Sequence, residues 1–184
     1  MIKKIFLGLA IFSLSIISYA QESYTDEIKV GVKNFWEKSN WEGVISIGSY
    51  HDRNYYSSKS INRFNERNEG YGVGLVYTSG KGNEHSVKYL RISDSEYNPQ
   101  HLFGYQYMYN IFKSDIDLQL GVMTGITSRK VIKDNKRITA PFILPAIGVK
   151  AWNVKVNLTY IPELKLSGDK YGGFVYSWMT YEFK

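Results

Sequence analysis

The chain has 184 residues, a length that allows one domain once an export signal is removed. It contains no cysteine, which excludes disulfide bonds, thiol catalysis and lipoprotein acylation. The formal net charge is +6, and the aromatic content of 16% is high for a soluble protein of this size. The mild basic excess suits anionic lipid headgroups, and aromatic girdles at two membrane interfaces would use the 16 tyrosines and 4 tryptophans.

The first 20 residues have the three parts of a secretory signal peptide. Lys3 and Lys4 form a positive start, residues 5–17 an apolar core, and residues 18–20, Ser-Tyr-Ala, a cleavage site. Cleavage there leaves 21 basic residues against 17 acidic ones, a net charge of +4, and a mature chain that begins near Gln21. The alternative is a retained signal anchor. No later stretch reaches about 18 consecutive apolar residues, so a helical membrane protein is disfavoured.

Residues 21–40 are predicted to form an amphipathic helix on the periplasmic side. Between residues 25 and 39 four apolar side chains recur at the spacing of one helix face: Ile28, Val32, Phe35 and Trp36. A helix docked on a soluble core would show the same pattern.

From residue 41 onward the apolar residues recur with period two, which is the pattern of β-strands with one apolar face. The aromatic bulk at the strand ends favours lipid outside and a narrow lumen inside, whereas a soluble sandwich would bury that face. Eight such segments are predicted: 43–51, 70–78, 85–94, 102–112, 115–128, 138–150, 152–161 and 171–183. The last ends in Phe183, one residue before the C-terminus. Residues 41–184 are therefore predicted to be all-β, an eight-stranded antiparallel transmembrane β-barrel.

The connections alternate in length. Short links fall near residues 80–83, 113–114 and 151, and longer ones cover 52–69, 95–101, 129–137 and 162–170. Outer-membrane barrels place short turns in the periplasm and long loops outside. The first and third strands therefore both run outward, and His51 and Asp94-Ser95 are predicted to meet at the outer rim.

Prolines interrupt the sixth predicted strand and end the seventh. Pro141 and Pro145 lie in one apolar run, and Pro162 follows the next strand. Because proline cannot donate a ladder hydrogen bond, we expect a gap in the outer half of the wall between these strands. A lipid tail would enter sideways there if the inner-face glycines leave a void, and otherwise these glycines only relieve curvature: Gly72, Gly74, Gly104, Gly121, Gly125, Gly148 and Gly173.

Seven segments carry a likeness to a known family: residues 62–67 (Asn-Arg-Phe-Asn-Glu-Arg), 94–95 (Asp-Ser), 104–105 (Gly-Tyr), 124–129 (Thr-Gly-Ile-Thr-Ser-Arg), 144–145 (Leu-Pro), 159–162 (Thr-Tyr-Ile-Pro) and 177–179 (Ser-Trp-Met). In this order and spacing the chain resembles the PagP family of lipid A palmitoyltransferases. The resemblance implies a tilted eight-strand barrel with an acyl-chain pocket in its outer half. It also implies transfer of a palmitoyl chain from the sn-1 position of a phospholipid to lipid A.

The resemblance also implies roles for residues. The essential histidine of the family matches His51, its adjacent Asp and Ser match Asp94 and Ser95, and its lateral-access prolines match Pro145 and Pro162. The chain departs from the family at a second access gap, where prolines of the best-known members are replaced, and at the pocket floor, where glycine is replaced. The residues at these positions are Ser46, Asn68 and Gln106.

Acyl transfer needs a base, an activated hydroxyl and donors for the oxyanion. His51 is the candidate base, Ser95 attacks the ester or polarises its carbonyl, and Asp94 orients the imidazole. The competing interpretation is a solvated histidine beside a Ser-Asp-Ser turn. Four basic residues are candidates for lipid phosphate contacts, although a solvated loop explains each of them as well: Arg63, Arg67, Arg129 and Lys133.

We therefore expect an outer-membrane acyltransferase of a Gram-negative cell, with a phospholipid donor and lipid A as acceptor. It is expected to be a membrane-embedded monomer without cofactor, metal or nucleic acid, and to raise resistance to cationic antimicrobial peptides. The alternative function is a non-enzymatic barrel, an adhesin or a surface-protective protein. Gln106 either shortens the acyl pocket from below or merely fills the lower lumen.

Overall fold

The computed structural model describes residues 33, 35–112, 114–131, 136–166 and 169–184. The predicted signal peptide, residues 1–20, lies outside the described residues, as does most of the predicted helix. Residues 33 and 35–38 are helical, and Lys33 Nζ lies 3.8 Å from Glu37 Oε1, one turn further on. Ser39–Lys184 form a separate compact unit. Among the described residues no helix is long and apolar enough to cross a membrane.

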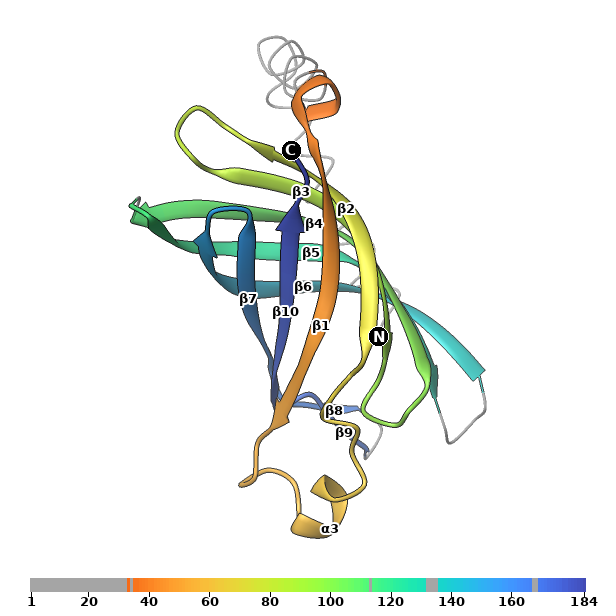
Figure 1. Ribbon diagram of the computed structural model, residues 1–184. Helices are drawn as coiled ribbons and strands as arrows, with labels where there is room; N and C mark the ends of the chain where they lie inside the picture. The colour runs from red at the N-terminus through yellow and green to blue at the C-terminus, as the bar shows by residue number, and fades with distance from the viewer. Residues whose placement is uncertain (1–32, 34, 113, 132–135, 167–168) are drawn as a thin grey trace, which may run out of the picture. The chain divides into compact units, whose positions relative to one another are not determined.

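The second unit is a closed antiparallel barrel of eight strands, as predicted (Figure 1). Its strands are β1 (Asn40–His51), β2 (Gly70–Thr78), β3 (Glu84–Ser93), β4 (Pro99–Phe112), β5 (Ile116–Val131), β6 (Lys136–Ala151), β7 (Val154–Ile161) and β10 (Phe174–Glu182). Neighbours in sequence pair around the wall, and β10 closes the barrel against β1. One end also carries the short helix α3 (Ser58–Ile61) and a hairpin of β8 (Leu164–Leu166) and β9 (Asp169–Tyr171).

Two predicted loops contain more regular structure than expected. The segment 129–137 was predicted to be a loop, but Arg129 and Lys130 continue β5 and pair with Ile138 and Arg137 of β6. The segment 162–170 contains most of the β8–β9 hairpin. Both are polar sequences without a clear apolar alternation. The period-two pattern therefore could not predict that they form strands.

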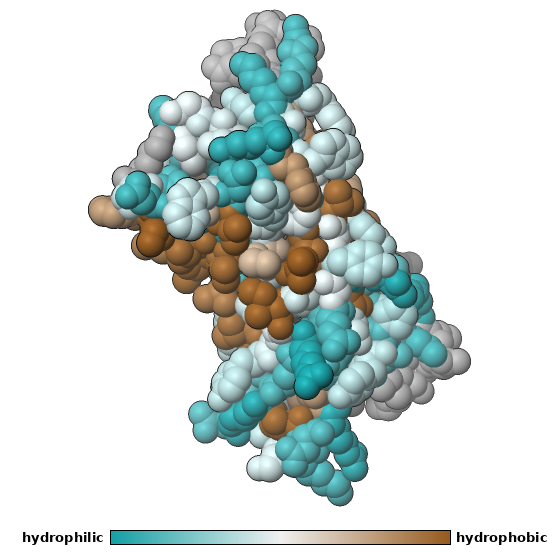
Figure 2. Space-filling view, viewed as in Figure 1, coloured by the Kyte–Doolittle hydropathy of each residue, from teal (hydrophilic) through white to brown (hydrophobic). Residues whose placement is uncertain are grey.

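The alternation sorts side chains as predicted, with apolar ones outside and small or polar ones inside. On β4 Phe103, Tyr105 and Tyr109 are exposed while Gln106 and Met108 are fully buried. Figure 2 shows that hydrophobic side chains gather at mid-height on one face of the barrel, with hydrophilic ones toward both ends. This distribution of apolar side chains is the reverse of that in a soluble protein, and it is the distribution that a lipid-facing wall requires.

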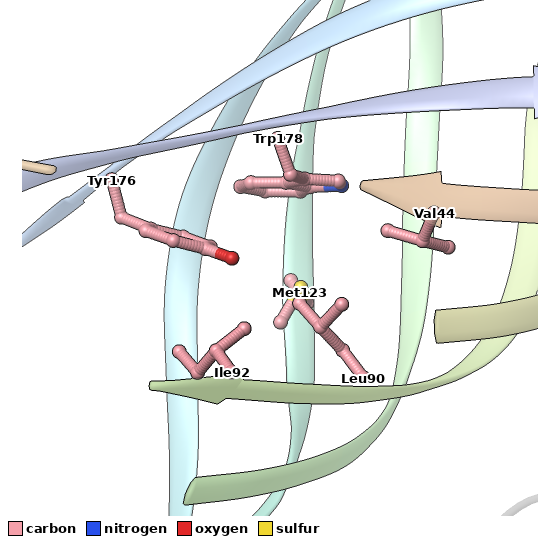
Figure 3. Close-up of a cluster of buried hydrophobic side chains, with 6 residues drawn as sticks. All are labelled: Val44, Leu90, Ile92, Met123, Tyr176 and Trp178. Atoms are coloured by element: carbon pink, nitrogen blue, oxygen red, sulfur yellow. The ribbon is translucent and has the colours of Figure 1, made fainter. Parts of the chain in front are cut away.

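The lumen has an apolar outer half and a charged inner half. Tyr176 and Trp178 of β10 stack with centroids 5.6 Å apart, facing the apolar side chains of the strands opposite (Figure 3). The buried cluster consists of Val44, Leu90, Ile92, Met123, Tyr176 and Trp178. Further from the rim that carries α3 lie ion pairs between strands that are far apart in sequence: Glu42 with Lys88, and Glu84 with Lys150 and Lys155. The lumen therefore holds an apolar cluster near the rim that carries α3 and a polar plug toward its other end.

Candidate active site

The ends of β1 and β3 bring His51 and Ser95 together, as the connection lengths predicted. His51 Nε2 lies 3.0 Å from Ser95 Oγ, and only 2% of His51 is exposed. The two residues are 44 positions apart in sequence, and they meet because β1 and β3 flank β2 and end at the same rim. A nearly buried imidazole in hydrogen-bond reach of a hydroxyl is the arrangement that proton transfer to or from that hydroxyl requires.

Aromatic rings enclose the imidazole on several sides. The ring centroids of Phe64, Phe174 and Tyr56 lie 4.5, 4.9 and 5.7 Å from that of His51. Tyr56 is itself held in place, because its hydroxyl donates to Gly172 O at 2.7 Å. The rings exclude water from His51 and strengthen the electrostatic interactions around it.

The second nitrogen of the imidazole faces a carboxylate that sequence reasoning did not single out. Glu66 Oε1 lies 3.2 Å from His51 Nδ1 and also accepts from the backbone N–H of His51 at 3.0 Å. Arg53 donates to both carboxylate oxygens, at 2.8 and 2.7 Å. This guanidinium, with the hydrogen bonds from His51, lowers the pKa of Glu66 to about 2. Glu66 is therefore an ionised acceptor beside His51 at neutral pH.

Asp94 occupies a different position from the one expected. Its Oδ1 accepts the backbone N–H groups of Glu96 and Asn98, at 2.9 and 2.8 Å, and its own N–H donates to Asn98 O. It therefore builds the turn that presents Ser95, while the carboxylate in contact with the imidazole is that of Glu66. The only sequence signal for Glu66 was its place inside the family-like segment 62–67, because a loop residue has no periodicity to reveal it.

The gap predicted between the sixth and seventh strands is present. Pairing of β6 with β7 runs from Ala151 and Val154 only as far as Ala146 and Thr159, although β6 continues to pair with β5 to its outer end. Pro145 is the first residue beyond the last pair, and both it and Pro162 are exposed. A role of these prolines in lipid entry remains a prediction.

The second gap of the family also has a counterpart, despite the loss of its prolines. Ladder pairing of β1 with β2 ends at Ile45 and Tyr71, so the outer part of β1 has no ladder partner on that side. The loop residue Glu66 instead accepts from Ser49 N–H at 2.7 Å. Asn68 turns the chain with a positive φ of 43°, and its side chain donates to Ser93 O.

Gln106 lies in the lumen at the lower edge of the apolar cluster. It is fully buried, and its Nε2 donates to Asn157 Oδ1 at 3.2 Å and contacts Met108 Sδ at 3.1 Å. The polar partner of Nε2 thus comes from β7, across the lumen, while Oε1 has no hydrogen-bond partner among the described residues.

The candidate phosphate contacts lie on different segments of the chain. Arg63 and Arg67 are exposed on the loop after β1, Arg129 is half-buried on β5, and Lys133 lies outside the described residues. Within the described part of the chain no group of three His, Asp or Glu side chains is placed to hold a metal ion.

Comparison with known proteins identifies the family to which this arrangement belongs. Residues 31–179 match the family described as the antimicrobial peptide resistance and lipid A acylation protein PagP. The chain belongs to the PagP family. This confirms the predicted resemblance and, at the level of the family, the expected lipid A acyltransferase class. The apolar outer wall and the membership together fit an outer-membrane protein.

The relatives cover most of the chain at low identity. The lipid A acyltransferase PagP of Citrobacter rodentium is 27% identical over 187 residues, covering 97% of this chain and 93% of its own length. The lipid A palmitoyltransferase PagP of Escherichia coli K12 is 25% identical over 183 residues, covering 97% and 94%. The lipid A acyltransferase PagP of Musicola paradisiaca is 24% identical over 166 residues, covering 88% and 83%.

Proposed function

We propose that this protein transfers a palmitoyl chain, or one of similar length, from the sn-1 position of a phospholipid to a hydroxyl group of lipid A in the outer membrane. The observation that carries the proposal is the 3.0 Å contact between His51 Nε2 and Ser95 Oγ at the rim of a lipid-facing barrel. The family membership supplies the substrate class, since its described activity is lipid A acylation.

The chemistry exchanges one ester for another. The bond between the sn-1 oxygen and the acyl carbon breaks, and a bond between a lipid A hydroxyl oxygen and the same carbon forms. The proton that leaves the hydroxyl ends on the glycerol oxygen, so the second product is a lysophospholipid. His51 takes this proton and returns it, either directly or by way of Ser95. Because one ester replaces another, the transfer needs no external energy source.

The lumen offers a place for the acyl chain. β10 passes from Phe174, beside His51, through Tyr176 to Trp178, which pairs with Asn157 near Gln106. An acyl chain that displaced or slid along this apolar cluster would have its ester end at His51. The edge of β6 beyond its last pair with β7 gives a lateral route for lipid tails. Export by residues 1–20 to the outer membrane of a Gram-negative cell, and increased resistance to cationic antimicrobial peptides, follow from the same proposal.

The test is transfer by the purified protein in detergent, supplied with phospholipid and lipid A and analysed by mass spectrometry. We expect acylated lipid A and lysophospholipid in equal amounts, without ATP. His51→Ala and Ser95→Ala should lower turnover by about 10² to 10⁴-fold, with circular dichroism unchanged because both side chains lie outside the ladder bonds. Absence of both products from the unmodified protein would refute the proposal, and near-normal turnover of either variant would remove that residue from the mechanism.

A further inference from the structure

We propose that Glu66, clamped by Arg53, is the positioning residue that holds the imidazole of His51 in the tautomer and orientation needed for proton transfer with Ser95. This inference rests on the proposed function, and it assigns to a loop glutamate the role that sequence reasoning gave to Asp94.

The hydrogen bonds of His51 leave one arrangement of its protons. An ionised carboxylate only accepts, so Glu66 Oε1 at 3.2 Å requires a proton on His51 Nδ1. In a neutral imidazole the lone pair then lies on Nε2, which faces Ser95 Oγ at 3.0 Å. The serine hydroxyl can therefore donate to Nε2. When His51 accepts a proton there, the resulting positive charge lies beside the negative carboxylate of Glu66, which stabilises it.

The carboxylate itself cannot turn away. Arg53 binds it in the bidentate geometry, one N–H to each oxygen, and the guanidinium also lies 4.5 Å from the ring centroid of Tyr50. The pKa of Glu66, lowered to about 2 by this guanidinium, keeps the carboxylate ionised at neutral pH. The acceptor at Nδ1 is thus fixed in both position and charge.

The backbone of the loop is fixed to both strands that carry the reacting groups. On one side, Ser49 N–H donates to Glu66 O at 2.7 Å, and on the other, Asn65 N–H donates to Ser95 O at 2.9 Å. Gly48 makes the first contact possible, because it has a φ of +151° and a β-carbon there would lie 2.6 Å from Glu66 O. The segment with Glu66 therefore joins the His51 strand to the Ser95 turn.

The other groups around His51 do not take this role. Phe64 and Phe174 cannot accept a hydrogen bond in the manner of a carboxylate, and the hydroxyl of Tyr56 is bonded to Gly172 O. Asp94 uses Oδ1 for the turn that carries Ser95. Among the described residues the charged groups at the imidazole are thus Glu66, in contact with it, and Arg53, bound behind Glu66.

The test is Glu66→Gln, compared with Glu69→Gln as the matched control. Glu69 is an exposed glutamate three residues further along the same segment, and it is not part of the proposed site. Glu66→Gln should lower kcat by about 10² to 10⁴-fold, as for a mispositioned general base, with little change in KM. Glu69→Gln should leave both unchanged. Arg53→Gln keeps the Glu66 carboxylate but removes the guanidinium that holds it, so it should lower kcat by a smaller factor.

A spectroscopic measurement separates positioning from mere support of the fold. In protein labelled with ¹⁵N at histidine, His51 should show a protonated Nδ1 and an unprotonated Nε2 at neutral pH, and Glu66→Gln should lose the population of this single tautomer. An unchanged tautomer signal, or unchanged kcat, in Glu66→Gln overturns the inference. If the unmodified protein transfers no acyl chain, the proposed function fails, and the tautomer measurement still decides whether Glu66 holds the imidazole. Should Glu66→Gln not fold, Arg53→Gln supplies both measurements.

Discussion

The hydroxyl of Thr159 donates to the backbone carbonyl of Pro145 at 2.6 Å, at the point where the β6–β7 ladder stops. In a strand the N and the carbonyl of one residue point to the same neighbour, so the nitrogen of Pro145 also faces β7. A proline nitrogen cannot donate, and the side chain of Thr159 satisfies the one group that remains. At Pro145 the edge therefore leaves no unsatisfied backbone group facing β7, as a lipid environment demands.

The first prediction concerns this edge. Pro145→Ala combined with Pro162→Ala restores two backbone donors and should let the ladder extend outward, narrowing the gap. We expect slower exchange of amide hydrogens in residues 143–146 and a lower rate of acyl transfer. The measurement is amide exchange with turnover in the same detergent. Thr159→Val is the control, because it removes the hydroxyl while keeping both prolines, and it should not slow exchange. Faster transfer by the double variant would show that the gap is not the route of entry.

The second prediction concerns the polar plug. Lys88 Nζ and Glu42 Oε1 form an ion pair at 3.0 Å with side chains 4% and 2% exposed. Lys88→Met leaves the carboxylate buried without its partner, which typically costs about 3–5 kcal/mol. The free energy of unfolding, measured by denaturant titration in lipid vesicles, should fall by about this amount.

The matched control for the plug is the double variant Glu42→Gln with Lys88→Met. With both charges removed, most of the lost stability should return, because the penalty belongs to the unpaired charge and not to the lost attraction. A double variant that stays as unstable as Lys88→Met alone would mean that the lost stability does not come from the unpaired carboxylate. Acyl transfer is expected to survive in the double variant, since the pair lies in the inner half of the lumen.

The third prediction concerns acid. The folded-state pKa of Glu66 is about 2, below its ordinary value of 4.5. A lowered pKa means that the ionised carboxylate stabilises the loop above about pH 4.5, and that this contribution is lost as the pH falls from 4.5 toward 2. The amide of Ser49, bonded to Glu66 O, should therefore stay protected from exchange at about pH 5 and lose protection toward about pH 2.

Two comparisons check that this loss of protection comes from Glu66. The amide of Gly82, which is bonded to Ser79 O in a turn at the other end of the barrel, should not show the same change between these two conditions. In Glu66→Gln the protection of Ser49 should depend far less on pH, because the titrating group is gone. An equal acid response in the variant would assign the effect to another group.

Much of the fold follows from two regularities in the sequence. The period-two alternation assigned residues to the inner and outer faces correctly. Every strand of the barrel has one face toward lipid and one toward the lumen, so each strand shows this alternation. Alternating connection lengths placed His51 and Ser95 at one rim, and prolines marked the edge of β6. These are properties of single strands and their ends, which sequence carries locally.

The parts that sequence did not reveal depend on contacts across the barrel or on loops. Glu66 reaches His51 from a loop without periodicity, and the Asn157 partner of Gln106 comes from a strand 51 positions away. The β8–β9 hairpin and the continuation of β5 through Arg129 occur in polar stretches where no apolar face is needed. The first two contacts join residues from separate segments, and the two hairpins form without an apolar face, so no period-two pattern predicts any of them.

The fourth prediction concerns the length of the acyl chain. Gln106 is fully buried at the lower edge of the apolar cluster, and Asn157 accepts from its Nε2, which removes the cost of about 1–3 kcal/mol for leaving that donor unpaired. A buried amide held in this way should act as a floor. Each CH₂ excluded from an apolar pocket forfeits about 0.8 kcal/mol, so a floor raised by a few carbons displaces palmitate as the preferred chain.

The measurement offers phospholipids of graded acyl length to the unmodified protein and to Gln106→Gly. The variant deepens the pocket by one side chain, so its preference should shift toward longer chains. Gln119→Gly is the matched control, because Gln119 is an equally buried glutamine that pairs with Asn110, further below the apolar cluster. Its length profile should stay that of the unmodified protein even if its stability falls. Identical profiles for all three proteins would show that Gln106 only fills the lower lumen and that another residue measures the chain.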